Sequence, residues 1–270
     1  MALVTVARLG HVGLIAEVIK DRGLIEMIDT RLVPDNQEEI TPGEAVAGML
    51  LNGLGFANRP LSLTPPFFAN KPLDLLFREG ICAEMFHRFQ LGRRLEEVHA
   101  YGCDRLLSEI AVAVCAHEGI ALRFNHLDTT SFALTGAYVP DSDEQAMTIT
   151  HGHAKDYRPD LKQAVLELMV SQDGGVPFVS KSWDGNTSDT VMFQERAAAL
   201  LATFQRSPTP RYLVADSKLD QEANAATLLA LGFITRIPNT LTLVSQVSTQ
   251  ALRWDTWQRL DAPTRYQRVE

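Results

Sequence analysis

The hydrophobic positions in the first part of the chain repeat with helical spacing. Apolar side chains in residues 12–19 stand three and four positions apart, and this run ends at Gly23. A second run, in residues 24–32, ends just before Pro34. This spacing predicts two short amphipathic helices.

A third helix is predicted after residue 41. Thr41, Pro42 and Glu44 have the arrangement of a capping box, with a hydroxyl at the N-cap, proline at the first helical position and glutamate three residues on. After a proline-rich break at residues 60–72, more helices are predicted at residues 73–77, 84–89, 92–99 and 104–118. We therefore expect a helical N-terminal domain over residues 1–119. We assign to its core Met49, Met85, Phe89 and Cys115.

The pattern changes after Gly119 from helical to strand-like. Residues 122–132 form a short, partly β-branched segment between Gly119 and Gly136, which predicts a strand that carries Asp128. Two further strands, at residues 164–171 and 176–183, flank the turn-forming sequence of residues 172–175. The three segments together predict an antiparallel meander.

Helices and strands alternate in the next stretch. Residues 187–189 are expected to cap a helix that runs to about residue 204, and the apolar strand at residues 211–216 ends on Asp216. A helix at 221–231 and a strand at 233–236 complete a β-β-β-α-β-α-β order.

This order resembles the connectivity of the ribonuclease-H-like fold. In that fold the first and fourth strands lie side by side, which would bring Asp128 next to Asp216. Two carboxylates at the edge of a sheet suit Mg²⁺ or Mn²⁺, which prefer oxygen ligands. The predicted fold class is therefore α+β, with a helical N-terminal domain followed by an incomplete ribonuclease-H-like core that has a mixed sheet.

The composition narrows the classes of function. The chain has 270 residues, 25 basic and 33 acidic side chains, and a formal net charge of -8. This balance argues against nucleic-acid binding by bulk charge alone, so any such contact must be local.

Three unpaired cysteines argue against a disulfide framework and favour the cytoplasm. No apolar run reaches the roughly 20 residues of a membrane-spanning helix, and no membrane partner is expected.

Four blocks of sequence carry a family resemblance. They are residues 126–131, 151–163, 185–189 and 214–217. They look like the corresponding blocks of the DDE transposases of bacterial insertion sequences, and residues 151–163 resemble the family signature G-x-[SA]-K-D-x-R-P-D-L-K-Q. Residues 9–29 are similar to the helical domain that precedes the catalytic core in one branch of these enzymes.

The resemblance implies roles for particular residues. Asp128 matches the first catalytic acid and Asp216 the second, and both are expected to bind metal in a two-metal mechanism of phosphodiester hydrolysis and strand transfer. The basic residues of the signature, Lys155, Arg158 and Lys162, are expected to contact DNA phosphates near the scissile bond, although a solvated loop explains them equally well. The implied partners are insertion-sequence ends, target DNA and other copies of the chain.

The third acid of the family, a glutamate on a late helix, has no match. Glu270 is the remaining candidate at the end of the chain. We expect residues 120–240 to form the first part of the core and residues 241–270 to begin an insertion or a truncated tail. The alternative is a catalytically inactive remnant or regulatory fragment that binds DNA or intact transposase.

Other hydrolase classes each lack a necessary residue. His151 and His153 have a spacing found in zinc hydrolases, but no histidine follows position 153. Aspartic proteases would need glycine after Asp-Thr or Asp-Ser, and a dehalogenase-type phosphatase would need an aspartate at Thr130. Asp128 and Asp216 could also serve only to accept hydrogen bonds from turn amides, as single aspartates at strand ends often do. The helical domain could dock DNA, mediate dimerisation or serve only as packing.

Overall fold

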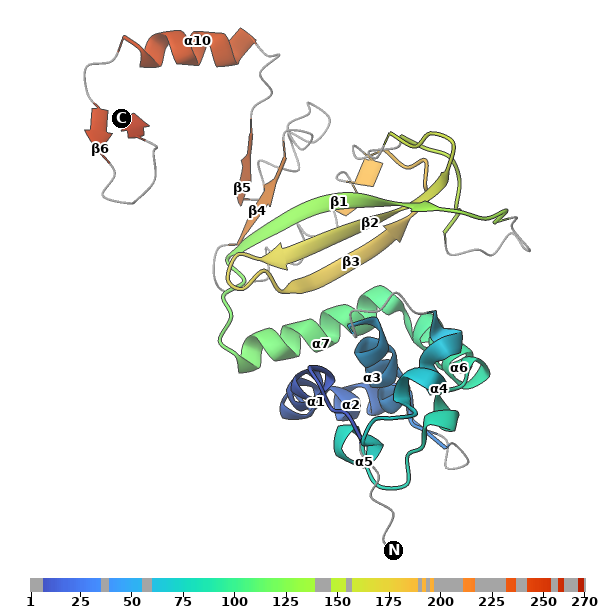
Figure 1. The fold of residues 1–270 in the computed structure, drawn as a ribbon. Helices are drawn as coiled ribbons and strands as arrows, with labels where there is room; N and C mark the ends of the chain where they lie inside the picture. Colours follow the sequence, from blue (N-terminus) through green and yellow to red (C-terminus); the bar gives the residue numbers. More distant parts are fainter. Residues whose placement is uncertain are drawn as a thin grey trace, which may run out of the picture. The chain divides into compact units, whose positions relative to one another are not determined.

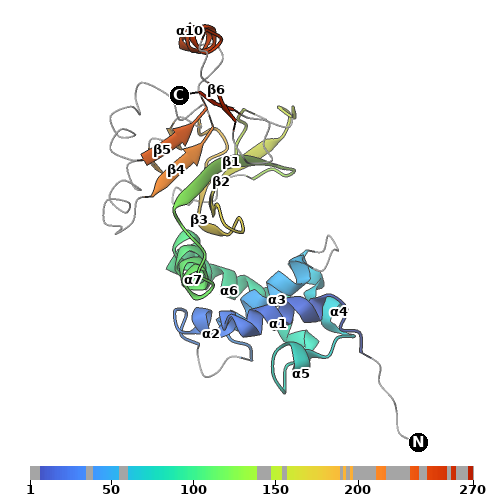
Figure 2. The ribbon, with the colours of Figure 1, turned by 90° about the vertical axis from the view of Figure 1, so that its left-hand side faces the viewer.

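The computed structural model describes most of the helical segments and the strands of the chain. The described residues are 7–34, 39–54, 60–138, 147–153, 157–188, 191–192, 195–196, 211–216, 232–236, 242–253, 257–259 and 267–269. The chain divides into two compact units (Figures 1 and 2). One consists of Met1–Ile120 with Val176–Ser180, and the other of Ala121–Gly175 with Lys181–Glu270.

The helical unit begins with the two predicted amphipathic helices. Gly23 separates them because its left-handed backbone, with φ of 60°, is a conformation that glycine adopts without steric cost. Thr41 and Glu44 form the predicted capping box: the Thr41 hydroxyl accepts from the Glu44 amide at 3.1 Å, and the Glu44 carboxylate accepts from the Thr41 amide at 2.9 Å. The helices, with the short 3₁₀ turns η1 and η2, are α1 (Val12–Asp21), α2 (Leu24–Asp29), α3 (Pro42–Gly53), η1 (Leu61–Leu63), α4 (Thr64–Phe68), α5 (Leu73–Leu76), η2 (Ala83–Phe86), α6 (Arg88–Tyr101) and α7 (Cys103–His117).

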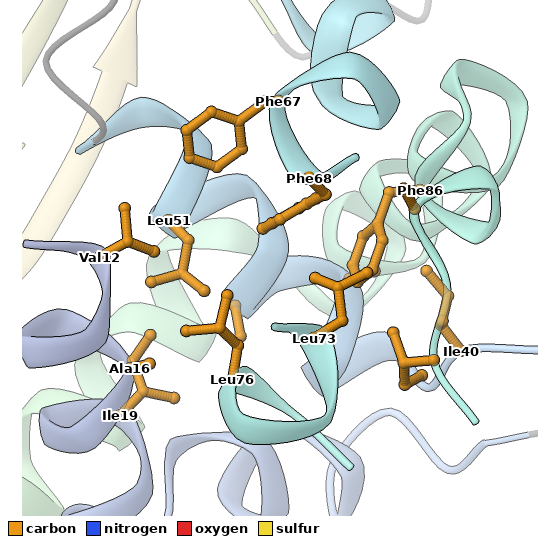
Figure 3. Close-up of a cluster of buried hydrophobic side chains, with 14 of the residues drawn as sticks. Val12, Ala16, Ile19, Ile40, Leu51, Phe67, Phe68, Leu73, Leu76 and Phe86 are labelled. Atoms are coloured by element: carbon orange, nitrogen blue, oxygen red, sulfur yellow. The ribbon is translucent and has the colours of Figure 1, made fainter. Parts of the chain in front are cut away.

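The core of this unit is built around aromatic rings (Figure 3). Phe68 contacts Phe86 with ring centroids 4.8 Å apart and Phe67 at 4.9 Å. Gly48 of α3 lets Phe86 approach, since a β-carbon on Gly48 would stand 2.5 Å from that ring. Apolar side chains of α1, α3 and α5 close the cluster, among them Val12, Ala16, Ile19, Leu51, Leu73 and Leu76.

The predicted boundary between the helices at 84–89 and 92–99 was wrong. The chain instead forms η2, and α6 then begins at Arg88 because the His87 side chain accepts from the Gln90 amide at 3.2 Å. Phe89 therefore falls on the first turn of α6, where its side chain is 66% exposed, and the prediction that it is a core residue was also wrong. The core assignments that hold are Met49, Met85 and Cys115.

A five-stranded mixed sheet follows the helices; it belongs to the second unit except for residues 177–180 of one edge strand, which are grouped with the first. Its strands are β1 (Phe124–Leu134), β2 (Lys162–Ser171), β3 (Pro177–Trp183), β4 (Tyr212–Ala215) and β5 (Gly232–Thr235), in the order β3-β2-β1-β4-β5. β1 pairs antiparallel with β2 and parallel with β4, and β4 pairs parallel with β5. Helices followed by a mixed sheet make the chain an α+β protein, as predicted, with the first and fourth strands adjacent.

Several predicted elements lie at or beyond the limits of the described residues. Ser188 caps a helical turn by accepting from the Val191 amide at 3.4 Å, and helix is described only at 191–192 and 195–196 of the span predicted to reach residue 204. The predicted helix at 221–231 lies outside the described residues, as does Glu270. Further elements appear at α10 (Thr242–Ala251) and in the antiparallel pair β6 (Trp257–Arg259) and β7 (Gln267–Val269). In the described ranges, no helix has both the length and the apolar character to span a membrane.

Candidate functional site

Asp128 lies on β1, and Asp216 directly follows the neighbouring parallel strand β4. Phe124 pairs with Tyr212, and His126 pairs with Val214, so a constant 88 positions separate the paired residues of β1 and β4. The same 88 positions separate Asp128 from Asp216, which directly follows β4. The pairing of the two strands ends at His126 and Val214; continued by two residues, the same register would place the two aspartates opposite each other, about 4.8 Å apart in the strand-to-strand direction.

A continuation of this register would put the two aspartates on the same face of the sheet. Residues directly opposite each other on parallel strands point to one side, and the rings of Phe124 and Tyr212 demonstrate this by stacking with centroids 5.1 Å apart. Asp128 lies two pleats along from Phe124, and Asp216 lies two pleats along from Tyr212. Both aspartates are exposed. The alternate positions of β1 are buried on the other face; these are Asn125, Leu127 and Thr129.

Two hydrogen bonds between side chains and backbone involve the aspartates. The Asp128 Oδ1 atom accepts from the Thr129 amide at 2.7 Å, and the Thr235 hydroxyl of β5 donates to the Asp216 carbonyl oxygen at 2.6 Å. Thr235 therefore ties the chain leaving β4 to the next strand. The Thr235 contact fixes the position of the Asp216 backbone, and the side chains of both aspartates are exposed.

The other face of the sheet carries a buried carboxylate that sequence analysis did not identify. Glu167 of β2, opposite Thr129 in the register, is only 1% exposed. Its Oε2 atom accepts from Trp183 Nε1 at 2.7 Å, and its Oε1 atom forms an ion pair with Arg196. The signal was present as an acid inside the apolar run of β2. Because Glu167 points away from the face of Asp128, it belongs to the packing of the sheet and not to the aspartate pair.

The signature block folds back onto β2 and the segment after β3. Thr150 forms a two-way backbone bridge with Gln163, at 2.8 and 3.2 Å. The buried Gln163 side chain donates to the Gly185 carbonyl at 2.6 Å, and Gly152 abuts Gly185 so closely that a β-carbon would overlap its carbonyl. Two of the four family blocks are therefore locked together through Gln163.

The predicted phosphate-binding residues have different surroundings. Lys155 lies outside the described residues. Arg158 is exposed and forms a two-pronged ion pair with Asp160 at 2.7 and 2.8 Å, which raises the pKa of the guanidinium and lowers the pKa of the carboxyl group. Lys162 donates to the Ala137 carbonyl and, at 3.2 Å, to the Tyr138 carbonyl. Arg158 and Lys162 are thus engaged within the chain, and their DNA-binding role stays a prediction.

The donor set of the aspartate pair suits a hard divalent cation. Carboxylate oxygens are the ligands that Mg²⁺ and Mn²⁺ prefer, and these two are exposed on one face. A complete set needs further ligands, and within the described ranges no group of three His, Cys, Asp or Glu side chains is placed to hold a metal ion.

Comparisons with known proteins match the two parts of the chain differently. Residues 4–112 match the family described as "Domain of unknown function (DUF4277)". A search of curated protein sequences finds no match.

The comparison with solved structures finds transposases at low similarity. The catalytic domain of the Mos1 mariner transposase is 14% identical, with a TM-score of 0.28, over 58% of this chain and 72% of that one. The Mos1 paired-end complex with the left transposon end is 12% identical, with a TM-score of 0.28, over 90% and 86%. The piggyBac synaptic complex with hairpin DNA is 11% identical, with a TM-score of 0.32, over 92% and 46%. All three identities and TM-scores are low.

Proposed function

We propose that this chain is a transposase or a portion of one, acting on the DNA ends of an insertion sequence by metal-dependent phosphodiester hydrolysis and strand transfer. The observation that carries the proposal is the constant offset between β1 and β4, whose continuation by two residues would align Asp128 with Asp216. The resemblance of the blocks around these residues to DDE transposases supports it independently.

Asp128 and Asp216 would together hold Mg²⁺ or Mn²⁺ in this proposal. A pair of such ions, when bound, supplies activation of the attacking oxygen and stabilisation of the leaving oxygen. The chain's own contribution is to orient the Asp128 carboxylate, to which the Thr129 amide donates, and to position the Asp216 backbone, to which the Thr235 hydroxyl donates. The third acid is proposed to lie outside the described residues or in a continuation of the chain.

Metal binding tests the site without requiring a complete active centre. We expect the 270-residue chain to bind Mn²⁺, measured by loss of the free-ion electron paramagnetic resonance signal. Asp128→Asn and Asp216→Asn should each weaken binding at least tenfold, because each removes one carboxylate ligand. Asp173→Asn, in the exposed turn between β2 and β3, is the matched control. Unchanged Mn²⁺ affinity in both site variants would overturn the assignment.

Cleavage separates the enzyme from the regulatory alternative. Nicking of DNA that contains the element's ends should require Mg²⁺ or Mn²⁺ and both aspartates, and should be weak without the third acid. Extending the chain through the downstream reading frame should increase it. A chain that binds Mn²⁺ and DNA but stays inactive even when extended would be a regulatory fragment.

A further inference from the structure

One face of α6 presents an unusual set of side chains. Arg88, Phe89, Gly92 and Arg93 fall at positions i, i+1, i+4 and i+5, which lie on the same side of a helix. Both arginines are exposed, and Phe89 is 66% exposed. The Arg88 guanidinium lies 4.6 Å from the centre of the Phe89 ring. We call these four residues the α6 basic face.

The opposite side of the same helix is accounted for by packing. Gln90, Leu91 and Arg94 are buried in the helical unit, and Arg94 forms a two-pronged contact with Glu97 at 2.6 and 2.7 Å. The outward position of Phe89 is therefore imposed by the register of a helix whose other face is fixed.

Gly92 has no structural explanation within the helical unit. Glycine is a poor helix former, so a glycine inside a helix lowers the stability of the helix unless packing compensates. Gly43 and Gly48 of α3 each have such a neighbour, whereas a β-carbon on Gly92 would meet nothing within 4 Å. Its flat surface, between an exposed ring and two arginines, suits the close approach of a partner from outside.

The charge of this face selects the chemistry of the partner. In the part of the chain that the structure describes, neither Arg88 nor Arg93 forms an ion pair with an acidic side chain. Glu96, one turn beyond Arg93, is the acidic residue on this side of the helix. Two exposed guanidinium groups beside an exposed ring form a local cationic surface on a chain whose formal charge is -8.

We propose that the α6 basic face binds the sugar–phosphate backbone of duplex DNA. Arg88 and Arg93 each contact a phosphate, since guanidinium groups pair strongly with phosphate oxygens. Phe89 packs against deoxyribose, and Gly92 admits the backbone close to the helix. The choice of DNA among polyanions rests on the proposed transposase function, but the surface is separate from the aspartate pair and needs no metal.

The salt dependence of DNA binding tests the arginines. Binding of the 270-residue chain to a duplex is measured by fluorescence anisotropy in EDTA over a series of salt concentrations. Each phosphate contact contributes about 0.9 to the slope of log K against log salt, so Arg88→Gln with Arg93→Gln should reduce the slope by about 1.8. The control is Arg105→Gln, also an exposed arginine of this unit but paired with Glu109. An equal slope in the double variant and the wild type overturns the proposal.

Substitution of Gly92 distinguishes a contact surface from a passive one. Gly92→Ala should raise the thermal midpoint by improving helix propensity, and should weaken DNA binding at least threefold because the added methyl group keeps the backbone away. Gly53→Ala, at the end of α3, also has open space and should leave DNA affinity unchanged. A Gly92→Ala protein that is more stable and binds DNA as well as wild type contradicts the role given to this face.

These outcomes separate the surface from the proposed catalytic function. If the wild-type chain fails to bind DNA in EDTA, or the double variant loses self-association and not DNA affinity, the α6 basic face is not a DNA-binding surface, whatever the Mn²⁺ and cleavage assays give. If the double variant loses DNA affinity while Asp128→Asn leaves Mn²⁺ binding intact, the α6 basic face is supported as a DNA-binding surface and the aspartate metal site is refuted.

Discussion

Gly152 and Gly185 approach so closely that a β-carbon on Gly152 would stand 1.9 Å from the Gly185 carbonyl oxygen. Gly185 is equally close to a third segment, since a β-carbon on it would stand 2.0 Å from the Gln163 carbonyl oxygen. Both glycines come from blocks that resemble transposase motifs. Their place in those blocks has a steric cause: three backbone segments meet where no side chain fits.

Substituting Gly152 by alanine should destabilise the sheet unit. Backbone atoms cannot move aside as a flexible side chain does, so we expect Gly152→Ala to lower the free energy of unfolding by about 1–3 kcal/mol. Urea denaturation measures this. Gly53→Ala is the control, and because its β-carbon meets open space it should be neutral or slightly stabilising. Equal stabilities for the two variants would contradict the close packing of these segments.

Substituting Arg196 should lower the free energy of unfolding, because it leaves the buried Glu167 carboxylate without its ion-pair partner. Arg196→Met leaves Trp183 as the hydrogen-bond partner of that carboxylate among the described residues, and breaking a buried ion pair in this way costs about 3–5 kcal/mol. Glu195→Gln is the neighbouring control, since the Lys181–Glu195 pair is exposed and such pairs contribute about 1 kcal/mol or less. Both are measured by chemical unfolding, and similar losses would refute the buried pair.

Glu109 should make the stability of the helical unit depend on pH in the acid range. Hydrogen bonds from Arg105, Arg31 and Tyr101 lower the pKa of its carboxyl group from 4.5 to about 2. Because the folded-state pKa is depressed, this stabilisation is present above about pH 4.5 and is lost as the pH falls towards 2.

The urea midpoint between pH 5 and pH 2.5 tests this pH dependence. It should fall less steeply in Glu109→Gln than in the wild type, since the variant lacks the titrating group. Parallel curves for the two proteins would show that the contacts of Glu109 do not persist in solution.

Asp160 should weaken any DNA contact of Arg158, because its carboxylate occupies the guanidinium that a phosphate would need. An exposed ion pair is worth about 0.2–1 kcal/mol, so Asp160→Asn should tighten DNA binding by up to about fivefold, and Arg158→Gln should weaken it. Anisotropy at low salt in EDTA measures both. Unchanged DNA affinity in both variants would show that Arg158 is a solvated loop residue that does not contact DNA.

The local features of the chain were largely predictable. The capping box at Thr41 and the break at Gly23 depend on neighbouring residues alone, and the structure confirms both. The hairpin turn between β2 and β3 likewise follows from glycines that adopt positive φ, at 73° and 62°. The start of α6 was not predictable with the same rules, because the cap there is a histidine and the helix continues through Gly92.

The candidate site was predictable as a pair of residues, and the fold resemblance implied that they are neighbours, but the register between their strands was not predictable. The sequence by itself determined that Asp128 and Asp216 stand on or directly after strands, because alternation and strand-end position are encoded locally. Only the tertiary structure decided that the pairing of β1 with β4 has an offset of 88 positions, that Glu167 points to the opposite face, and that Phe89 is exposed. The register between distant strands and the face that a side chain presents arise from packing against segments far away in the chain, and no local pattern records them.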